Sequence, residues 1–158
     1  MANALVSVPS PRNEPVLSYA PGTPERRALR AQIERMSKEI VEITPRIGGR
    51  SVGTGHKADT VMPHSHHHVL GCWHKAGAGE VTRAIEAARE AHGPWSRLPW
   101  EQRAAVFLRA ADLLAGPWRQ VLNAASMLGQ SKTAYQAEID AACELIDFWR
   151  FNVSFMQE

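Results

Sequence analysis

Three acidic side chains near the end of the chain are spaced so that they could serve a binding site. Asp140, Glu144 and Asp147 are four and three residues apart, so on a helix their carboxylates lie on one face. Arg150 follows Asp147 by three residues and can neutralise it, whereas Glu144 has no cationic residue at helical spacing. Two interpretations stay open: a solvated acidic face, or a carboxylate held beside a binding site on a neighbouring element.

Histidines are concentrated between Pro63 and Gly71. In an extended strand His64, His66 and His68 would point to one face, and three imidazoles on one face can hold zinc. A metal site also needs fixed geometry and partners that orient its ligands, which the end of a strand does not guarantee. We expect an exposed histidine-rich connection without a metal, and keep a site formed by these three histidines as the alternative.

Neither the two cysteines nor a short glycine motif points to chemistry in this chain. Cys72 falls in an expected strand and Cys143 lies among apolar residues, where cysteines behave as small hydrophobic side chains. Residues 77–79, Gly-Ala-Gly, lie between an expected strand and a helix, as in a dinucleotide fingerprint. The third small residue is replaced by Thr82, however, and no second strand with a ribose-binding acid follows. We therefore expect a plain strand-to-helix turn and no catalytic cysteine.

An extended arm and a helix are expected to precede these residues. Prolines at positions 9, 11, 15 and 21 predict an arm over residues 1–23, which either lies along a surface or stays mobile. Thr23 and Pro24 then provide a hydroxyl N-cap and a proline at the first helical position. The helix is expected over residues 24–41, with an apolar stripe formed by Leu29, Ile33, Met36 and Ile40.

Short strands and then longer helices are expected in the remainder. Residues 46–52 are typical of a hairpin with a Gly-Gly turn, and residues 59–62 and 69–73 of strands, so that strands are confined to residues 45–75. Apolar spacing over residues 79–158 is helical, with breaks at residues 93–94, 116–117 and 129 and a last helix from about Lys132. The expected fold class is α+β, mostly helical with short N-terminal β-hairpins.

Composition bounds the class of protein. With 158 residues, 44% hydrophobic and 22% charged, the chain has the make-up of a globular domain. The net charge of +2 is too small to indicate nucleic-acid binding, and no apolar run approaches the roughly 20 residues that span a membrane. Two cysteines are too few for a disulfide framework, so a cytoplasmic, reducing location is expected.

Several stretches resemble the aldehyde dehydrogenase family. Its early helices are similar to residues 100–114, WEQRAAVFLRAADLL, and to residues 127–132, MLGQSK. The resemblance narrows to the branch that acts on L-glutamate γ-semialdehyde (1-pyrroline-5-carboxylate) at residues 135–152, YQAEIDAACELIDFWRFN. Residues 12–16, RNEPV, and 24–26, PER, are similar to the N-terminal arm and helix start of the same branch. The resemblance covers nearly the whole chain.

The resemblance implies an NAD-dependent oxidation of glutamate semialdehyde to L-glutamate in proline catabolism, through a thiohemiacetal on a catalytic cysteine. In the family the nucleophile, the general-base glutamate and the Rossmann strands that bind NAD come from sequence beyond the equivalent of Glu158. Residues 24–158 would therefore be the N-terminal part of the α/β coenzyme-binding domain, without catalytic or cofactor-binding residues. Glu144 matches a family glutamate near the aldehyde pocket, which implies a substrate-site or gating role, with Phe151 as its neighbour.

The resemblance further implies a homo-oligomer when the enzyme is complete, and an isolated chain without activity. The alternative is a non-catalytic module, either a His-rich metal binder or a helical interaction module. An exposed apolar surface at residues 148–155 that binds hydrophobic dye would favour the enzyme portion. A monodisperse chain that melts cooperatively would favour the module.

Overall fold

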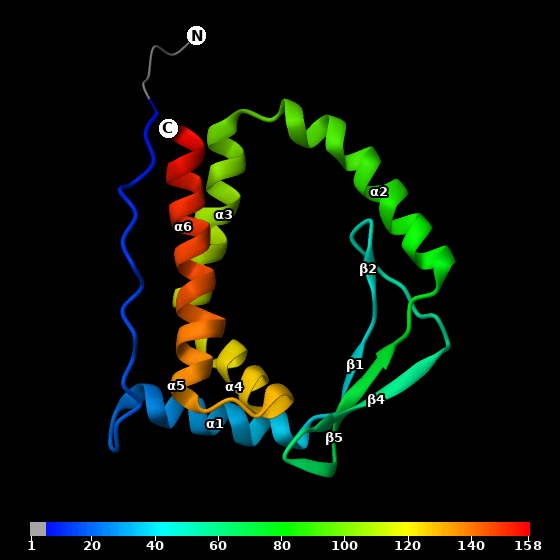
Figure 1. Ribbon diagram of the computed structural model, residues 1–158, viewed down its shortest axis with the longest axis vertical. Helices are drawn as coiled ribbons and strands as arrows, with labels where there is room; N and C mark the ends of the chain where they lie inside the picture. The colour runs from blue at the N-terminus through cyan, green and yellow to red at the C-terminus, as the bar shows by residue number, and fades with distance from the viewer. Residues whose placement is uncertain (1–5) are drawn as a thin grey trace.

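The computed structural model describes residues 6–158, more than half of which lie in helices (Figure 1). This mostly helical chain with a few short strands agrees with the predicted composition of elements. In chain order the elements are α1 Pro24–Lys38, β1 Val41–Ile43, β2 Arg46–Ile47, β3 Arg50–Ser51, β4 Lys57–Met62, β5 Ser65–His74, α2 Ala78–Arg97, α3 Trp100–Ala115, α4 Arg119–Gln130, α5 Ala134–Gln136, the π-helical segment η1 Ala137–Cys143, and α6 Glu144–Gln157.

The described part of the arm lies along the surface of α6, which is the first of the two arrangements predicted for it. Residues 6–20 form neither helix nor strand and run beside α6 toward α1 (Figure 1). The backbone N–H of Val8 donates to Gln157 Oε1 at 2.8 Å, and that of Leu17 donates to Glu138 Oε1 at 2.7 Å. Side chains of the last helical stretch thus satisfy backbone groups of an arm that has no strand partner.

Helix α1 begins as predicted but ends three residues earlier. Thr23 Oγ1 accepts a hydrogen bond from the N–H of Arg26 at 3.4 Å, with proline at the first helical position. After Lys38 the backbone turns extended at Glu39, and Ile40 is 75% exposed instead of completing the apolar stripe. The next residues form β1, because they pair in parallel with β5, a partner that the local sequence does not indicate.

The strands form a three-stranded sheet and a separate hairpin. The sheet has the order β1-β5-β4, with β1 parallel and β4 antiparallel to β5. The predicted hairpin is present as β2 and β3, and Gly48 and Gly49 make its turn with φ of 55° and 77°. The predicted histidine-rich connection is wrong, because only Pro63 and His64 form the turn and β5 already begins at Ser65.

Two predicted helix breaks are also wrong. Helix α2 continues through Pro94 to Arg97. A residue before proline avoids the α region partly because its Cβ clashes with the proline ring, and Gly93 has no Cβ. Gly129 lies inside α4, which ends only where Ser131 adopts a left-handed conformation with φ of 57°. The predicted break at residues 116–117 is confirmed, since α3 ends before Gly116.

The last predicted helix starts two residues late and is not a continuous α-helix. Thr133 caps it, accepting a hydrogen bond from the N–H of Gln136 at 3.2 Å. Residues 137–143 then form η1, in which backbone hydrogen bonds join residues five apart, before α6 resumes the α-helical pattern.

The core lies where α1, α3, α4 and α6 meet, and α2 stands apart from it (Figure 1). Leu29 packs with Tyr19 and Ala124, while Ile146 packs with Leu114 and Ala111. None of the residues of α2, all of which the structure describes, is buried. Its apolar residues Val81 and Ile85 therefore face solvent.

Candidate functional site

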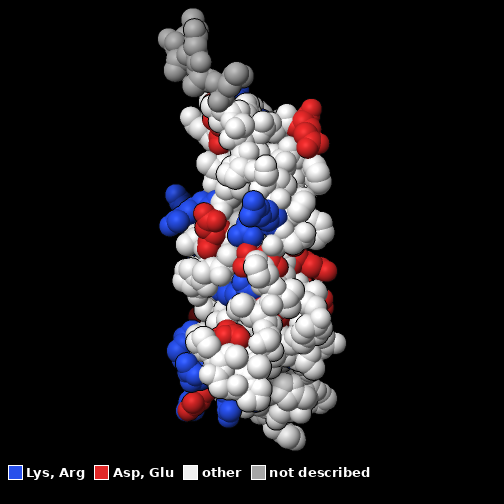
Figure 2. Space-filling view, turned by 90° about the vertical axis from the view of Figure 1, so that its left-hand side faces the viewer, with Lys and Arg blue, Asp and Glu red and all other residues white. Residues whose placement is uncertain are grey.

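A groove runs between the arm and the outer face of α6. It has a volume of about 390 Å³ and is lined by Asn13, Glu144, Asp147, Phe148, Phe151, Asn152 and Phe155. The structure thus brings the two predicted site residues, Glu144 and Phe151, to one groove, about two turns apart on the same face of α6. Basic and acidic side chains are interspersed on the face that carries the arm, without a large patch of one sign (Figure 2).

Glu144 supplies the free carboxylate of the groove. Its side chain is exposed, and among residues 6–158 it makes no hydrogen bond or ion pair. Its acidic neighbour one turn earlier is neutralised, because Lys132 Nζ lies 2.9 Å from Asp140 Oδ2.

Asp147 is held by the arm and not by Arg150. It accepts hydrogen bonds from Asn13 Nδ2 at 2.7 Å and from the backbone N–H of Glu14 at 2.6 Å. The expected pair between Asp147 and Arg150 is wrong, because Arg150 Nη1 donates to Glu14 Oε2 at 2.7 Å. The arm competes for this arginine, and Asn13 becomes a wall of the groove.

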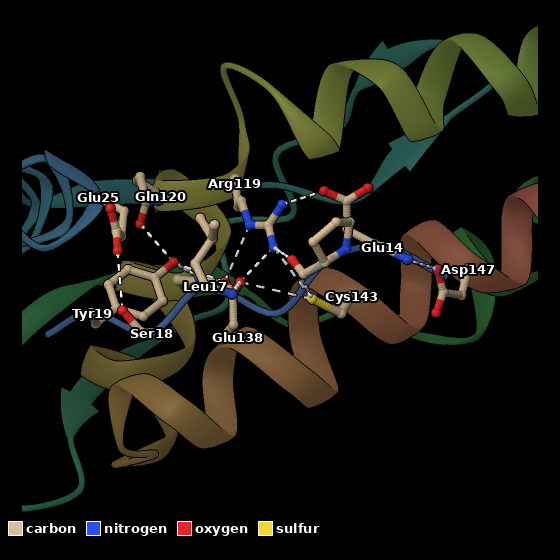
Figure 3. A network of polar contacts seen from close by, with 12 residues as sticks. Glu14, Leu17, Ser18, Tyr19, Glu25, Arg119, Gln120, Glu138, Cys143 and Asp147 are labelled. Atoms are coloured by element: carbon tan, nitrogen blue, oxygen red, sulfur yellow. Dashed lines mark hydrogen bonds and ion pairs between the residues drawn. The ribbon is translucent and has the colours of Figure 1, made fainter. Parts of the chain in front are cut away.

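A buried polar network is joined to the groove through Glu14, whose N–H donates to the groove residue Asp147 (Figure 3). Its centre is Glu138, which is fully buried in η1 and forms an ion pair with Arg119 at the start of α4. Glu138 Oε2 also accepts hydrogen bonds from Tyr19 Oη at 2.7 Å and Asn123 Nδ2 at 2.8 Å. Each carboxylate oxygen therefore has donors, as a buried charge requires.

Arg119 joins three separate parts of the chain. Its guanidinium donates to Glu138, to the carboxylate of Glu14 and, at 2.7 Å, to the carbonyl of Pro15. Its Nη2 also lies 3.4 Å from Cys143 Sγ. Figure 3 shows Arg119 between Glu14 and Glu138, with the thiol of Cys143 beside them. The arm, α4 and η1 are thus tied together through one side chain.

Burial and hydrogen bonding shift the pKa values of this network. Burial opposes ionisation of Glu138, but the donors around it, Arg119 foremost, lower its pKa below the ordinary value. Burial raises the pKa of Tyr19 from 10.0 to about 12, helped by its hydrogen bond to Glu138. Burial and then the charge of Glu138 raise the pKa of Cys143 from 9.0 to about 11. A raised pKa favours the protonated, less reactive form of the Cys143 thiol at neutral pH.

Sequence reasoning did not find this network, although one signal was present. Glu138 lies four residues before Ala142 and eight before Ile146, so it occupies the apolar stripe of the last helix. An acid in such a stripe requires a buried partner. Nothing in local spacing identifies Arg119 as that partner, since it lies 19 residues earlier.

The predicted alternative metal ligands are not gathered in a site. His64 Nδ1 is hydrogen-bonded to Ser131 Oγ at 2.7 Å, and His68 Nε2 donates to the carbonyl of Ser37 at 2.7 Å. His66 is exposed on β5. Within residues 6–158 no group of three or more His, Cys, Asp or Glu side chains could hold a metal ion.

The glycine motif forms the strand-to-helix turn that was expected. Gly77 is the N-cap of α2, and its N–H donates to Glu80 Oε2 at 2.9 Å. A carboxylate of the chain itself therefore occupies this helix N-terminus, which does not suit the pyrophosphate of NAD.

Comparisons with known proteins place the chain among dehydrogenases. The aldehyde dehydrogenase family matches residues 51–158. The delta-1-pyrroline-5-carboxylate dehydrogenase of Agaricus bisporus is 45% identical over 156 residues, 98% of this chain and 29% of that protein. The human mitochondrial protein of the same name is 42% identical over 146 residues, 92% of this chain and 26% of that protein.

Solved structures agree with these relatives. The delta-pyrroline-5-carboxylate dehydrogenase from Mycobacterium tuberculosis, solved with bound NAD, is similar with a TM-score of 0.96 and 51% identity. The match covers 99% of this chain and 29% of that one. The chain thus spans less than a third of the length of these relatives. On the strength of the family match, the chain belongs to the aldehyde dehydrogenase family.

Proposed function

We propose that this chain forms the N-terminal part of an NAD-dependent dehydrogenase that oxidises L-glutamate γ-semialdehyde, the open form of 1-pyrroline-5-carboxylate, to L-glutamate in proline catabolism. The observation that carries the proposal is the groove, in which the unpaired carboxylate of Glu144 faces the same space as Phe148 and Phe151. The names of the relatives at 41–51% identity support this substrate and this cofactor.

Residues of this chain would shape the aldehyde site and would not perform the redox chemistry. Phenyl rings beside the groove would exclude water from the bound aldehyde, and the carboxylate of Glu144 would orient or admit it. NAD supplies the hydride acceptor when it is bound. The described residues offer no suitable site for it, since Glu80 caps the one glycine-rich strand-to-helix turn among them. We place the cofactor and the nucleophile outside residues 6–158.

A hybrid enzyme tests the proposal. In it, these 158 residues replace the corresponding segment of the Mycobacterium tuberculosis enzyme, and NADH formation from the semialdehyde is followed at 340 nm. We expect activity close to that of the parent, because the two segments share 51% identity and a TM-score of 0.96. A folded hybrid that binds NAD but oxidises no semialdehyde would contradict the proposal.

Glu144→Gln in the hybrid tests the assignment of the groove. We expect the KM for the semialdehyde to rise about tenfold, roughly 1.4 kcal/mol, because the amide keeps the shape and removes the charge. The matched control is Glu34→Gln, which makes the same change in the exposed pair with Lys38 on α1 and should leave the KM unchanged. Equal KM values for Glu144→Gln and the control would remove Glu144 from the site.

The isolated chain is expected to produce no NADH. Neither of its cysteines has the setting of a nucleophile: Cys72 lies within β5, and Cys143 is buried with a raised pKa. Purified chain incubated with NAD and the semialdehyde should therefore give no NADH above the background without protein. Stoichiometric formation of NADH would show that the chain carries its own catalytic residues.

The remaining expectations concern assembly and location. Both cysteines are free thiols, which supports a reducing compartment, and we infer a cytoplasmic one, although several relatives are named as mitochondrial. Within residues 6–158 no helix is long and apolar enough to cross a membrane. The homo-oligomer that the resemblance implies for the complete enzyme stays a prediction.

A further inference from the structure

We propose that the buried ion pair between Arg119 and Glu138 positions the groove, by holding the π-helical turn that directs Glu144 toward it. For its catalytic consequence this inference rests on the function proposed above. Neither Arg119 nor Glu138 lines the groove, so we infer that they act through the residues that follow Glu138 on η1 and α6.

The geometry of η1 explains why the turn is π-helical. Glu138 and Cys143 are five residues apart, and both contact Arg119, through the carboxylate and through Sγ at 3.4 Å. On an α-helix two such residues point about 140° apart. A π-helical turn holds more residues per turn, so it brings residues five apart closer to the same side of the helix. The distance of 3.8 Å between Cys143 Sγ and Glu138 Oε1 shows that they share one side.

The π-helical turn sets the direction of everything on α6. The backbone N–H of Glu144 closes η1 by donating to the carbonyl of Ile139, five residues back. A regular α-helix would return this bond to the residue four back and rotate α6 by one residue, about 100°. Glu144, Phe148 and Phe151 would then leave the groove together. The contacts of Arg119 thus determine which side chains of α6 line the groove.

The arm reinforces the same arrangement from the other side. Glu14 binds Arg119 with one carboxylate oxygen and Arg150 of α6 with the other. Its neighbour Asn13 donates to Asp147 and lines the groove. Arg119 therefore fixes the π-helical turn and, through Glu14, also fixes the position of the arm along α6.

Amide hydrogen exchange on the full chain tests the structural step. Glu138→Gln keeps the shape and removes the charge that holds Arg119. We expect the amides of residues 139–144 to exchange about tenfold faster, while those of α3 keep their protection. Glu34→Gln, the matched control on α1, should change neither region. Unchanged exchange at residues 139–144, or an equal acceleration across η1 and α3, would overturn the proposal.

A milder variant serves if Glu138→Gln does not fold. Tyr19→Phe removes a single donor to Glu138 and leaves the contacts of Arg119 in place. It should accelerate exchange at residues 139–144 about threefold, again without an effect on α3. The absence of a local effect in this folded variant would equally overturn the proposal.

A double-mutant cycle in the hybrid enzyme tests the catalytic step. Glu138→Gln should raise the KM for the semialdehyde about tenfold with kcat within twofold and the KM for NAD unchanged. Glu144→Gln should do the same, and the double variant should again lie near tenfold, because both changes remove one interaction. A hundredfold effect in the double variant, or a fall in kcat at constant KM, would mean a merely structural role. An inactive unmodified hybrid would contradict the proposed function alone, and the exchange experiment would still decide the inference.

Discussion

At the scale of the residue, the unusual feature is the conformation of Tyr19. Its φ of 52° lies in the left-handed region, which costs a side chain with a Cβ about 1–2 kcal/mol. Its hydroxyl is shared within the buried network, donating to Glu138 Oε2 at 2.7 Å and accepting from Asn123 Nδ2 at 2.9 Å. These contacts offset the backbone strain at Tyr19, and Gly22, with φ of 86°, supplies a second left-handed position in the turn before α1.

Tyr19→Phe is therefore expected to destabilise the chain measurably. The variant keeps the buried ring and leaves Glu138 with one donor fewer, a change that costs about 1–3 kcal/mol. Urea unfolding at pH 7, followed by circular dichroism, measures the loss. Tyr135→Phe is the control, since that side chain is 64% exposed. Equal midpoints for the two variants would contradict the expected cost.

The stability difference between the wild-type chain and Tyr19→Phe is expected to depend on pH. The pKa of Tyr19 is raised from 10.0 to about 12 in the folded chain, so folding favours the protonated phenol. The resulting stabilisation is complete below pH 10 and is lost as the pH rises through 12. We expect the gap in unfolding free energy between wild type and Tyr19→Phe to narrow over this range. Cys143 titrates in both proteins and cancels in the comparison. A gap that stays constant from pH 8 to 12 would contradict the shift.

At the scale of the element, local sequence patterns predicted helices and turns better than they predicted which elements contact one another. The cap at Thr23, the hairpin turn at residues 48–49 and the helical spacing after residue 79 are local properties, and the structure contains all three. The end of α1 depends instead on β5, about 30 residues later in the chain. The groove pair of Glu144 and Phe151 followed from resemblance. The contacts of Arg119 with Glu14 and Pro15, in contrast, join residues more than 100 positions apart, which local spacing cannot reveal.

The parallel pairing of β1 with β5 depends on one glycine. A Cβ added at Gly71 would meet the carbonyl oxygen of Val41 at 2.2 Å, so a side chain cannot fit between the strands. Gly71→Ala should cost about 1–3 kcal/mol, as other overpacked positions do, and should expose the amides of β1 to exchange. Gly79→Ala is the matched control, because an added Cβ there meets nothing within 4 Å. If the amides of β1 stayed protected from exchange in Gly71→Ala, the strands could accommodate the added Cβ, and the expected cost would be contradicted.

At the scale of the whole molecule, two apolar faces lack cover within the described residues. Phe148 and Phe155 on α6 are 59% and 60% exposed, and Val81 and Ile85 on α2 are 52% and 54% exposed. Most buried positions lie in α3, α4, η1 and α6, while α2 contributes none. The helical faces were evident from their spacing, but the surfaces that they meet are not evident from spacing alone.

These faces make the solution behaviour of the isolated chain predictable. Exposed apolar patches bind hydrophobic dyes and associate with one another, so the chain should enhance 1-anilinonaphthalene-8-sulfonate fluorescence and sediment as mixed oligomers. Replacing Phe148 and Phe155 together by serine should lower both signals severalfold, whereas Ala105→Ser on an exposed part of α3 should not. The hybrid enzyme should bind little dye, because the added two-thirds would cover both faces. A monodisperse isolated chain that binds no dye and melts cooperatively would favour the self-sufficient interaction module over part of an enzyme.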